Sequence, residues 1–354
     1  MAPDPPPELL ASAQSQASVF RLLTWKATIP LEIQIARDSF PGASKQGSED
    51  QSEDEDARER EEEVDLPRYY MQVPRYTYLP LLLPEIEQVL LPTVTLFDDA
   101  ATASQTETDN KGYRREDCWF EVEWNGKRGK QREVCKWHWS LDMIQLHTYI
   151  NARHSTAQSS SSSPLRLLLH LKPPEPKSST GTPSVPLSNS VDSCRIAFIS
   201  LLKEADYIRW GNTRRITGLR RADLEGAWNG IVEDNYEAHS RFVNKIVPLP
   251  LPAPSSSSTH SSNQTQPPET LGVSGPDSYF AVRSIPLKLY LPDNAPEVQD
   301  IVNPLNAYEP SDTAYSLATP ILYCVPVPPE AEVAWLAACV AAPDGWLRIG
   351  IVLH

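Results

Sequence analysis

Two short stretches far apart in the chain share one pattern and decide the fold: IPLEIQI at residues 29–35 and IPLKLYL at residues 285–291. In both, apolar residues alternate with polar ones, which is the period-two pattern of a strand buried on one face. Pro30 and Pro286 stand near the start of each strand, where a missing backbone donor is tolerated. The repeat predicts two copies of one small domain.

Each opening strand is followed, at the end of its region, by a second strand-like run: LRLLLHL at residues 165–171 and WLRIGIVL at residues 346–353. An opening strand, a helix and a closing strand fit a ubiquitin-like β-grasp domain. The second copy is compact, and the first is lengthened by insertions. The alternative is a chance likeness between two generic strands, because alternation alone is a weak signal.

The composition is that of a folded chain with long irregular connections. The 354 residues suffice for two or three domains, 40% of them are apolar, and 34 are proline, about twice the average share. The net charge of −14 is mostly local, since residues 49–65 hold eleven acidic residues against two arginines. Such a run repels itself, so it predicts a disordered insertion rather than an acidic folded surface.

Nothing in the sequence points to secretion, a membrane span, a metal or a cofactor. Residues 1–40 lack the apolar block of a signal peptide, and no apolar stretch approaches the ~20 residues that span a bilayer. We therefore expect a soluble, intracellular protein. Cys135, His138 and His147 lie close together in sequence, but they lack the spacing of a zinc site or of a catalytic thiol.

The predicted fold class is α+β, with two ubiquitin-like β-grasp domains flanking a helix-rich domain. Low-complexity stretches divide the chain. The expected parts are an N-terminal helix (1–24), the first ubiquitin-like domain (25–172), a linker (173–190), the helix-rich domain (191–247), a disordered linker (248–278) and the second ubiquitin-like domain (279–354). An acidic segment (41–65) and a serine run (155–164) are insertions in the first domain.

Local signals place further elements. A helix is expected over residues 5–23, and the first strand should run from Trp25 to Ile35. A second helix should begin near Pro84, since proline is favoured in the first turn of a helix. Asn125-Gly126 predicts the turn of a hairpin.

The proline-free residues 191–247 are predicted to be helical and contain the candidate site. Apolar residues recur there at spacings of three and four: Phe198, Leu201, Leu202, Ala205 and Ile208. At ~100° per residue, Lys203 projects roughly 160° from the centre of this stripe and should face outward, with Tyr207 and Trp210 near the same meridian. The plain alternative is a solvated lysine paired with Asp206 or Tyr207.

Six blocks of the chain resemble, in the same order, the autophagy protein 5 family. They are TWKATIPLEI (24–33), YYMQVPRYTYLPLL (69–82), KWHWSLDMI (136–144), FISLLKEADYIRWG (198–211), RSIPLKLYLP (283–292) and DGWLRIGIV (344–352). A shared order of six blocks is hard to obtain by chance. The resemblance implies two ubiquitin-like domains flanking a helix-rich domain, which matches the repeat.

The resemblance also implies a function. The family receives the C-terminal glycine of the ubiquitin-like modifier autophagy protein 12 through an isopeptide bond, and Lys203 occupies the acceptor's place in the KEAD motif. The conjugate binds the helix and coiled coil of autophagy protein 16. The resulting complex promotes transfer of autophagy protein 8 to phosphatidylethanolamine. The resemblance thus implies a cytoplasmic scaffold and conjugation substrate that is not itself an enzyme, with peripheral contact with the preautophagosomal structure membrane.

Two further sets of residues are candidates for partner contacts. Tyr207 and Trp210 would form part of the floor for the modifier, or Trp210 would be buried against a second helix. Arg75 lies in a block that resembles a family segment beside the groove for autophagy protein 16, and arginine is a frequent interface anchor. With it we select Tyr69 and Tyr76, for which packing within the first domain is the alternative.

Other functions stay open at this point. Basic clusters within 127–132 and 214–221 could attract acidic lipid headgroups or be solvated loop surface, and no motif for reading bases supports nucleic-acid binding. A thiol-dependent transferase with ubiquitin-like appendages is the alternative from another class. A non-covalent adaptor is a third possibility.

Overall fold

The computed structural model describes residues 7–36, 39, 67–98, 114–126, 129–155, 163–173, 190–247, 282–293, 295–302 and 317–354. The chain divides into two compact units. One is Thr28–Cys194, and the other combines Met1–Ala27 with Arg195–His354. The acidic insertion (41–65) and the predicted linker 248–278 lie outside the described residues.

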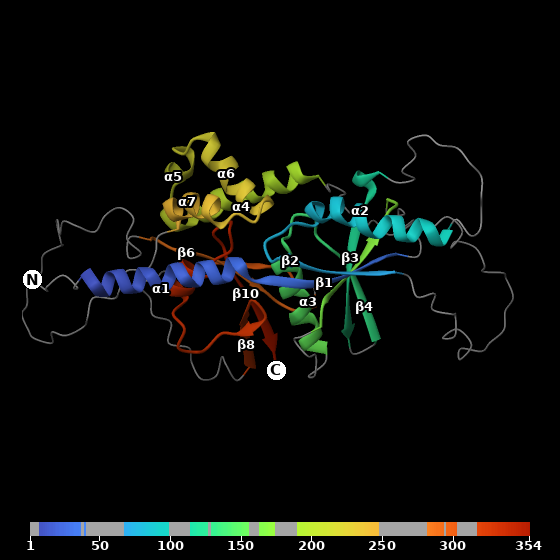
Figure 1. Cartoon of the computed structure of the whole chain (residues 1–354). Helices are drawn as coiled ribbons and strands as arrows, with labels where there is room; N and C mark the ends of the chain where they lie inside the picture. The colour runs from blue at the N-terminus through green and yellow to red at the C-terminus, as the bar shows by residue number, and fades with distance from the viewer. Residues whose placement is uncertain are drawn as a thin grey trace, which may run out of the picture. The chain divides into compact units, whose positions relative to one another are not determined.

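The first unit, Thr28–Cys194, is built on a five-stranded sheet of order β2-β1-β5-β3-β4 (Figure 1). Its strands are β1 (Thr28–Ile35), β2 (Arg68–Pro74), β3 (Trp119–Gly126), β4 (Gly129–Val134) and β5 (Leu165–His170). The opening strand β1 and the closing strand β5 run parallel, with Leu31 opposite Leu165. Antiparallel neighbours surround this central pair, which is the predicted β-grasp arrangement.

The two faces of this sheet differ in chemistry. Alternate residues of the strands form one apolar core with residues of α2 (Leu79–Asp98) and α3 (Leu141–Ser155), and a short 3-10 helix, η3 (Arg115–Asp117), precedes β3. On the other face, Arg166 Nε lies 3.4 Å from a Glu32 oxygen and Arg166 Nη1 lies 3.8 Å from a Glu123 oxygen. The opposite charges lie in one row across three strands.

The second unit contains another five-stranded sheet, of order β7-β6-β10-β8-β9. Its elements are β6 (Ile285–Tyr290), β7 (Val298–Val302), β8 (Ala318–Leu322), β9 (Val325–Pro326), the core helix α9 (Val333–Cys339) and β10 (Leu347–Leu353). The opening strand β6 again runs parallel to the closing strand β10. Lys288 is opposite Arg348 in this pair, as Glu32 is opposite Arg166 in the first sheet. The repeat therefore extends to the register of the strands.

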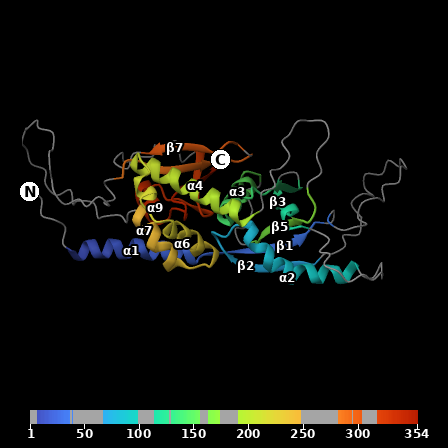
Figure 2. The same ribbon diagram turned by 90° about the horizontal axis from the view of Figure 1, so that it is seen from above.

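The helices of the second unit include the predicted helix-rich region. They are α4 (Val191–Trp210, of which the residues from Arg195 belong to this unit), α5 (Arg214–Thr217), α6 (Arg221–Val232) and α7 (Tyr236–Ile246) (Figures 1 and 2). Gly211, with φ of 72°, follows the last residue of α4, as the glycine signal predicted. Asn235 caps α7, because its side-chain oxygen accepts a hydrogen bond from Ala238 N at 3.1 Å.

The N-terminal helix α1 (Pro7–Lys26) belongs to the second unit, although it comes first in the chain. The Arg21 guanidinium donates to Ala338 O at 2.6 Å and to Val247 O at 3.0 Å. The Trp25 ring stacks on His239, with 4.6 Å between ring centroids. Helix α1 thus fastens the end of α7 to the second β-grasp domain.

Two predicted boundaries were wrong. Trp25 lies in α1 rather than in the first strand, because its ring is buried against His239. Helix α2 begins at Leu79, five residues before Pro84, and it contains Pro84 and Pro92. The apolar residues of its buried face offset the two missing backbone donors.

The predicted hairpin also differs in detail. Asn125 pairs with Lys130 and Gly126 pairs with Gly129, so Asn125-Gly126 forms the end of β3 rather than the turn itself, and residues 127–128 lie outside the described ranges. Helix α3 begins at Leu141, directly after Ser140, and continues to Ser155.

Candidate functional site

Lys203 lies in α4 and is exposed. Three residues of the predicted apolar stripe, Phe198, Leu202 and Ala205, are buried on the other side of the helix. Helix α4 is held by this buried side, so the lysine stands on a packed, regular support. The predicted outward position of Lys203 agrees with the structure.

Other exposed residues share the face of Lys203. Tyr207, one turn further on, is 57% exposed, and Ile196, two turns earlier, is 61% exposed, with Ser200 between. Sequence reasoning selected Tyr207 but missed Ile196. Its spacing of seven residues before Lys203 could have found it, because that spacing returns to the same side of a helix.

Trp210 is only partly exposed and packs within the second unit. Its indole nitrogen donates to Ile246 O at 3.3 Å, and the Arg215 guanidinium lies 3.7 Å from the centroid of its ring. Trp210 therefore fits the alternative of packing against a second helix, α7, better than the prediction of an exposed docking surface for the modifier. Tyr207 is the docking candidate that stays on the surface.

Two charged residues of α4 are buried, although the sequence pattern did not predict their burial. Asp206 is 1% exposed and Arg209 is 3% exposed. Burial raises the pKa of Asp206 to about 6, although the positive charges of Arg209 and Arg215 oppose this rise. Burial lowers the pKa of Arg209 to about 10. Since Asp206 faces inward, it does not act as the surface partner of Lys203 that the alternative required.

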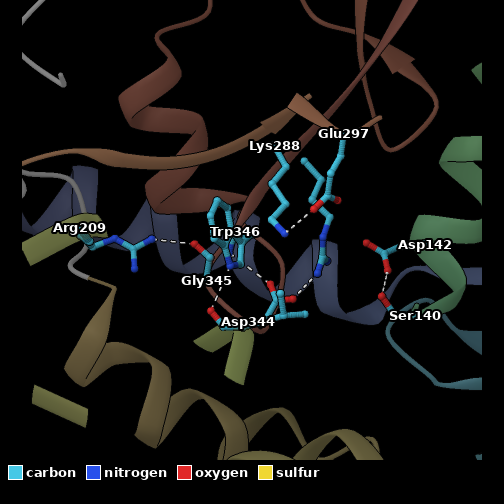
Figure 3. A network of polar contacts seen from close by, with 10 residues as sticks. Ser140, Asp142, Arg209, Lys288, Glu297, Asp344, Gly345 and Trp346 are labelled. Carbon is cyan, nitrogen blue, oxygen red and sulfur yellow. Dashed lines mark hydrogen bonds and ion pairs between the residues drawn. The ribbon is translucent and has the colours of Figure 1, made fainter. Parts of the chain in front are cut away.

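The buried side of α4 is in contact with the second β-grasp domain. Trp346 Nε1 donates to Leu201 O at 3.0 Å, and Arg209 Nη2 donates to Gly345 O at 2.8 Å (Figure 3). Figure 3 also shows Lys288 paired with Glu297, with 3.1 Å between Nζ and the carboxylate oxygen. Lys203, the acceptor candidate, thus lies on a helix that is hydrogen-bonded to the second β-grasp domain.

The three candidates for the partner groove are less accessible than expected. Arg75 and Tyr76 are buried, at 8% and 5% exposure. The main-chain oxygen of Arg75 accepts a hydrogen bond from Asp142 N at 2.8 Å at the start of α3, where the Ser140 hydroxyl also bonds the Asp142 carboxylate (Figure 3). Tyr69 is partly exposed, and its hydrogen bond to Glu85 raises its pKa.

The alternative sites find little support among the described residues. Burial raises the pKa of Cys118 and Cys194 to about 12 and that of Cys339 to about 11, so these thiols are poor nucleophiles. Burial also raises the pKa of Cys135. No cluster of potential metal ligands occurs within the described ranges, and none of the helices there has the length and apolar character needed to cross a bilayer.

The basic clusters are partly neutralised by neighbours. Lys130 and Arg132 lie 3.9 and 3.1 Å from oxygens of Glu123, and Arg221 pairs with Glu225 at 2.7 Å. Residues 127 and 128 lie outside the part of the chain that the structure describes. These contacts weaken both clusters as anion sites without removing them.

Two family models match the chain over the helical region and the second sheet domain. "Autophagy protein ATG5, alpha-helical bundle region" matches residues 191–249, and "Autophagy protein ATG5, UblB domain" matches residues 284–351. The match boundaries follow α4 to α7 and β6 to β10 closely.

Known proteins are similar over all or part of the chain. Autophagy protein 5 of Phaeosphaeria nodorum is 25% identical over 97% of this chain and 99% of its own. Autophagy-related protein 5 of Neurospora crassa is 33% identical over 44% of this chain and 46% of its own. The crystal structure of Kluyveromyces marxianus Atg5 matches with a TM-score of 0.56 over 94% of this chain and 99% of that one. At 17% identity this last likeness shows the fold alone.

Proposed function

We propose that the chain acts in autophagy as a member of the autophagy protein 5 family, and that Lys203 is the acceptor of an isopeptide bond to the modifier autophagy protein 12. The conjugate then serves as a scaffold with ligase-like activity in the lipidation of autophagy protein 8. The observation that supports this most is the exposed amine of Lys203 on a helix whose opposite side is buried.

The chemistry explains what the acceptor must supply. The neutral amine of Lys203 attacks the thioester carbonyl of the activated modifier, the C–N bond forms, the C–S bond breaks, and the thiolate leaves while Nζ loses a proton. An ordinary lysine amine has a pKa of about 10.4 and is almost fully protonated at pH 7. The conjugating enzyme therefore has to help remove the proton. The acceptor itself contributes a fixed, uncrowded position, which is worth a large effective concentration.

Tyr207 and Ile196 are the residues we assign to modifier docking, one on each side of Lys203. Exposed aromatic and aliphatic side chains supply contact area at low entropic cost, which is typical of interface residues. Trp210 would contribute through the packing of α4 on α7 rather than as a direct contact.

The scaffold role requires a second partner. We propose that the helix of autophagy protein 16 binds at the first β-grasp domain near Tyr69, with Arg75 and Tyr76 supporting the groove from within. Peripheral contact with the preautophagosomal membrane would come through this complex, and the protein would otherwise be cytoplasmic.

Lys203→Arg in a reconstituted conjugation reaction tests the proposal. The variant keeps the charge and removes the nucleophile, so the high-mass, reducing-agent-resistant product should disappear. Lys245→Arg is the matched control, because Lys245 is another helical lysine of the second unit. A persistent product with Lys203→Arg would refute the assignment, and loss of product with both variants would point to a general defect.

A further inference from the structure

We propose that the second β-grasp domain positions the acceptor lysine, with Trp346 and Arg209 as positioning residues. This inference rests on the proposed function, since it concerns the same amine. It adds a role for the turn Asp344-Gly345-Trp346, which lies directly before β10 and reaches α4 on both sides of the Lys203 position.

The first contact lies two residues before the lysine. Trp346 is fully buried, and its indole nitrogen donates to the main-chain oxygen of Leu201 at 3.0 Å. That oxygen belongs to the helix backbone itself. A fixed bond to it limits sliding of α4 along its axis, which a contact between flexible side chains would not do.

The second contact lies at Ala205 and Arg209. Arg209 Nη2 donates to Gly345 O at 2.8 Å, and both groups are buried. Gly345 has φ of 83°, and a Cβ atom placed on it would lie 3.3 Å from the Ala205 Cβ. The turn thus lies so close to the helix that a Cβ atom on Gly345 would be crowded, and this close contact opposes rotation of α4 toward the turn.

The third set of contacts involves the C-terminal end of α4 and its exposed residue Glu204. Arg209 O accepts hydrogen bonds from Arg283 N at 2.9 Å and from Ser284 N at 3.4 Å, just before β6. The Gln299 amide donates to the Glu204 carboxylate at 3.1 Å, next to Lys203 in sequence. Figure 2 shows β7, which carries Gln299, beside α4.

The anchoring turn is itself rigid. The Asp344 carboxylate accepts a hydrogen bond from Trp346 N at 3.2 Å and binds Arg348 within the buried interior (Figure 3). Lys288 Nζ lies 4.6 Å from the centre of the Trp346 ring and pairs with Glu297. Since Lys288 lies on β6 and Arg348 lies on β10, the position of the indole is linked to the central strands of the sheet.

These contacts bracket Lys203 from residue 201 to residue 209. They fix the axial position and the rotation of α4 relative to the sheet, and therefore the base of the lysine side chain. Displacement of a reacting group by about 1 Å can cost roughly 10²-fold in rate. A conjugating enzyme that rests on this unit would find the amine in a constant place.

A purely stabilising role of Trp346 and Arg209 predicts a different result. Loss of their contacts would then lower the amount of folded acceptor and leave the kinetics of the folded molecules unchanged. A positioning role lowers the maximal rate of transfer, while the acceptor concentration at half-maximal rate stays the same, because the surface that the donor touches is not altered.

The test uses the full-length chain with conjugating enzyme charged with the modifier as a thioester, in single-turnover reactions over a range of acceptor concentrations. Trp346→Phe keeps a ring and removes the donor to Leu201 O. Gln299→Ala removes an exposed contact and leaves the core intact. Trp119→Phe is the matched control, because it removes the same kind of bond, from Trp119 Nε1 to Lys172 O at 2.8 Å, in the first unit.

We expect Trp346→Phe to lower the maximal rate roughly tenfold and Gln299→Ala two- to threefold, each at unchanged half-maximal concentration, with Trp119→Phe equal to the parent. Urea midpoints above the assay conditions establish that each variant is folded. If Trp346→Phe does not fold, Gln299→Ala alone decides. Parental maximal rates in the folded variants would overturn the inference, whereas product from Lys203→Arg in the same assay would overturn the proposed function instead.

Discussion

Replacement of Asp206 by Asn should stabilise the second unit at neutral pH and not at acidic pH. Asp206 is 1% exposed, and burial raises its pKa from 3.8 to about 6. The folded state therefore holds this proton more tightly than the unfolded state does. The contribution of Asp206 to the free energy of unfolding is therefore complete below pH 3.8 and is lost as the pH rises through about 6.

The size of the effect follows from the two pKa values. A difference of about two between folded and unfolded pKa corresponds to about 3 kcal/mol. Asn has nearly the same volume and no charge to bury. We therefore expect Asp206→Asn to raise the free energy of unfolding by about 3 kcal/mol at pH 8 and by close to zero at pH 3.5.

His239 contributes the opposite trend. It is 3% exposed, and burial lowers its pKa from 6.5 to about 4, with the nearby charge of Arg21 acting in the same direction. Its contribution is complete above pH 6.5 and decreases as the pH falls to 4, by about 3 kcal/mol. In the parent chain the two trends largely cancel between pH 4 and 6.5.

Urea unfolding at pH 8, 6, 5 and 3.5, at constant ionic strength, measures both effects. The difference between variant and parent isolates Asp206, because all other titrations are shared. In Asp206→Asn the acid loss caused by His239 should become visible as a steep fall below pH 6.5. The reasoning is refuted if the variant is no more stable than the parent at pH 8, or if their difference does not change with pH.

Three further outcomes are expected. Arg21→Met should cost about 3 kcal/mol in the free energy of unfolding, because it leaves the oxygens of Ala338 and Val247 without a charged donor; an unchanged urea midpoint would contradict the role of α1 as a fastener. Tyr207→Ala should slow conjugation several-fold and change the free energy of unfolding by no more than about 0.5 kcal/mol. Tyr70→Ala, which removes an equally exposed tyrosine of β2, should leave both the rate and the stability unchanged. Equal rates for the two variants would remove Tyr207 from the docking surface. Replacement of all five cysteines by Ala should leave conjugation intact, and its loss with a folded protein would favour the thiol-dependent transferase.

Much of the fold could be predicted from the repeat in the sequence. Strand alternation around Leu31 and Leu287 predicted two β-grasp domains, and the parallel pairs of both sheets confirm the fold. The alternation could not reveal that α1 packs on the second unit, because Arg21 and Trp25 find their partners more than 200 residues away.

The site was predictable in part for the same reason. An apolar stripe fixes which side of a helix is buried, so the outward position of Lys203 follows from the sequence alone. The stripe did not predict that Asp206 is buried, although it lies about 60° around the helix from Lys203. Its burial depends on tertiary neighbours such as Ile216 of α5, which the pattern of α4 alone does not contain. Trp210 is likewise covered by a helix that follows it.

The most direct test of the account is peptide mapping of the protein isolated from its own cells. Tryptic digestion followed by mass spectrometry should find a branched peptide in which the C-terminal glycine of the modifier is joined to Nζ of Lys203, within a species that resists reducing agent. A branch on another lysine, or a modifier-bound species in which Lys203 is unmodified, would contradict it.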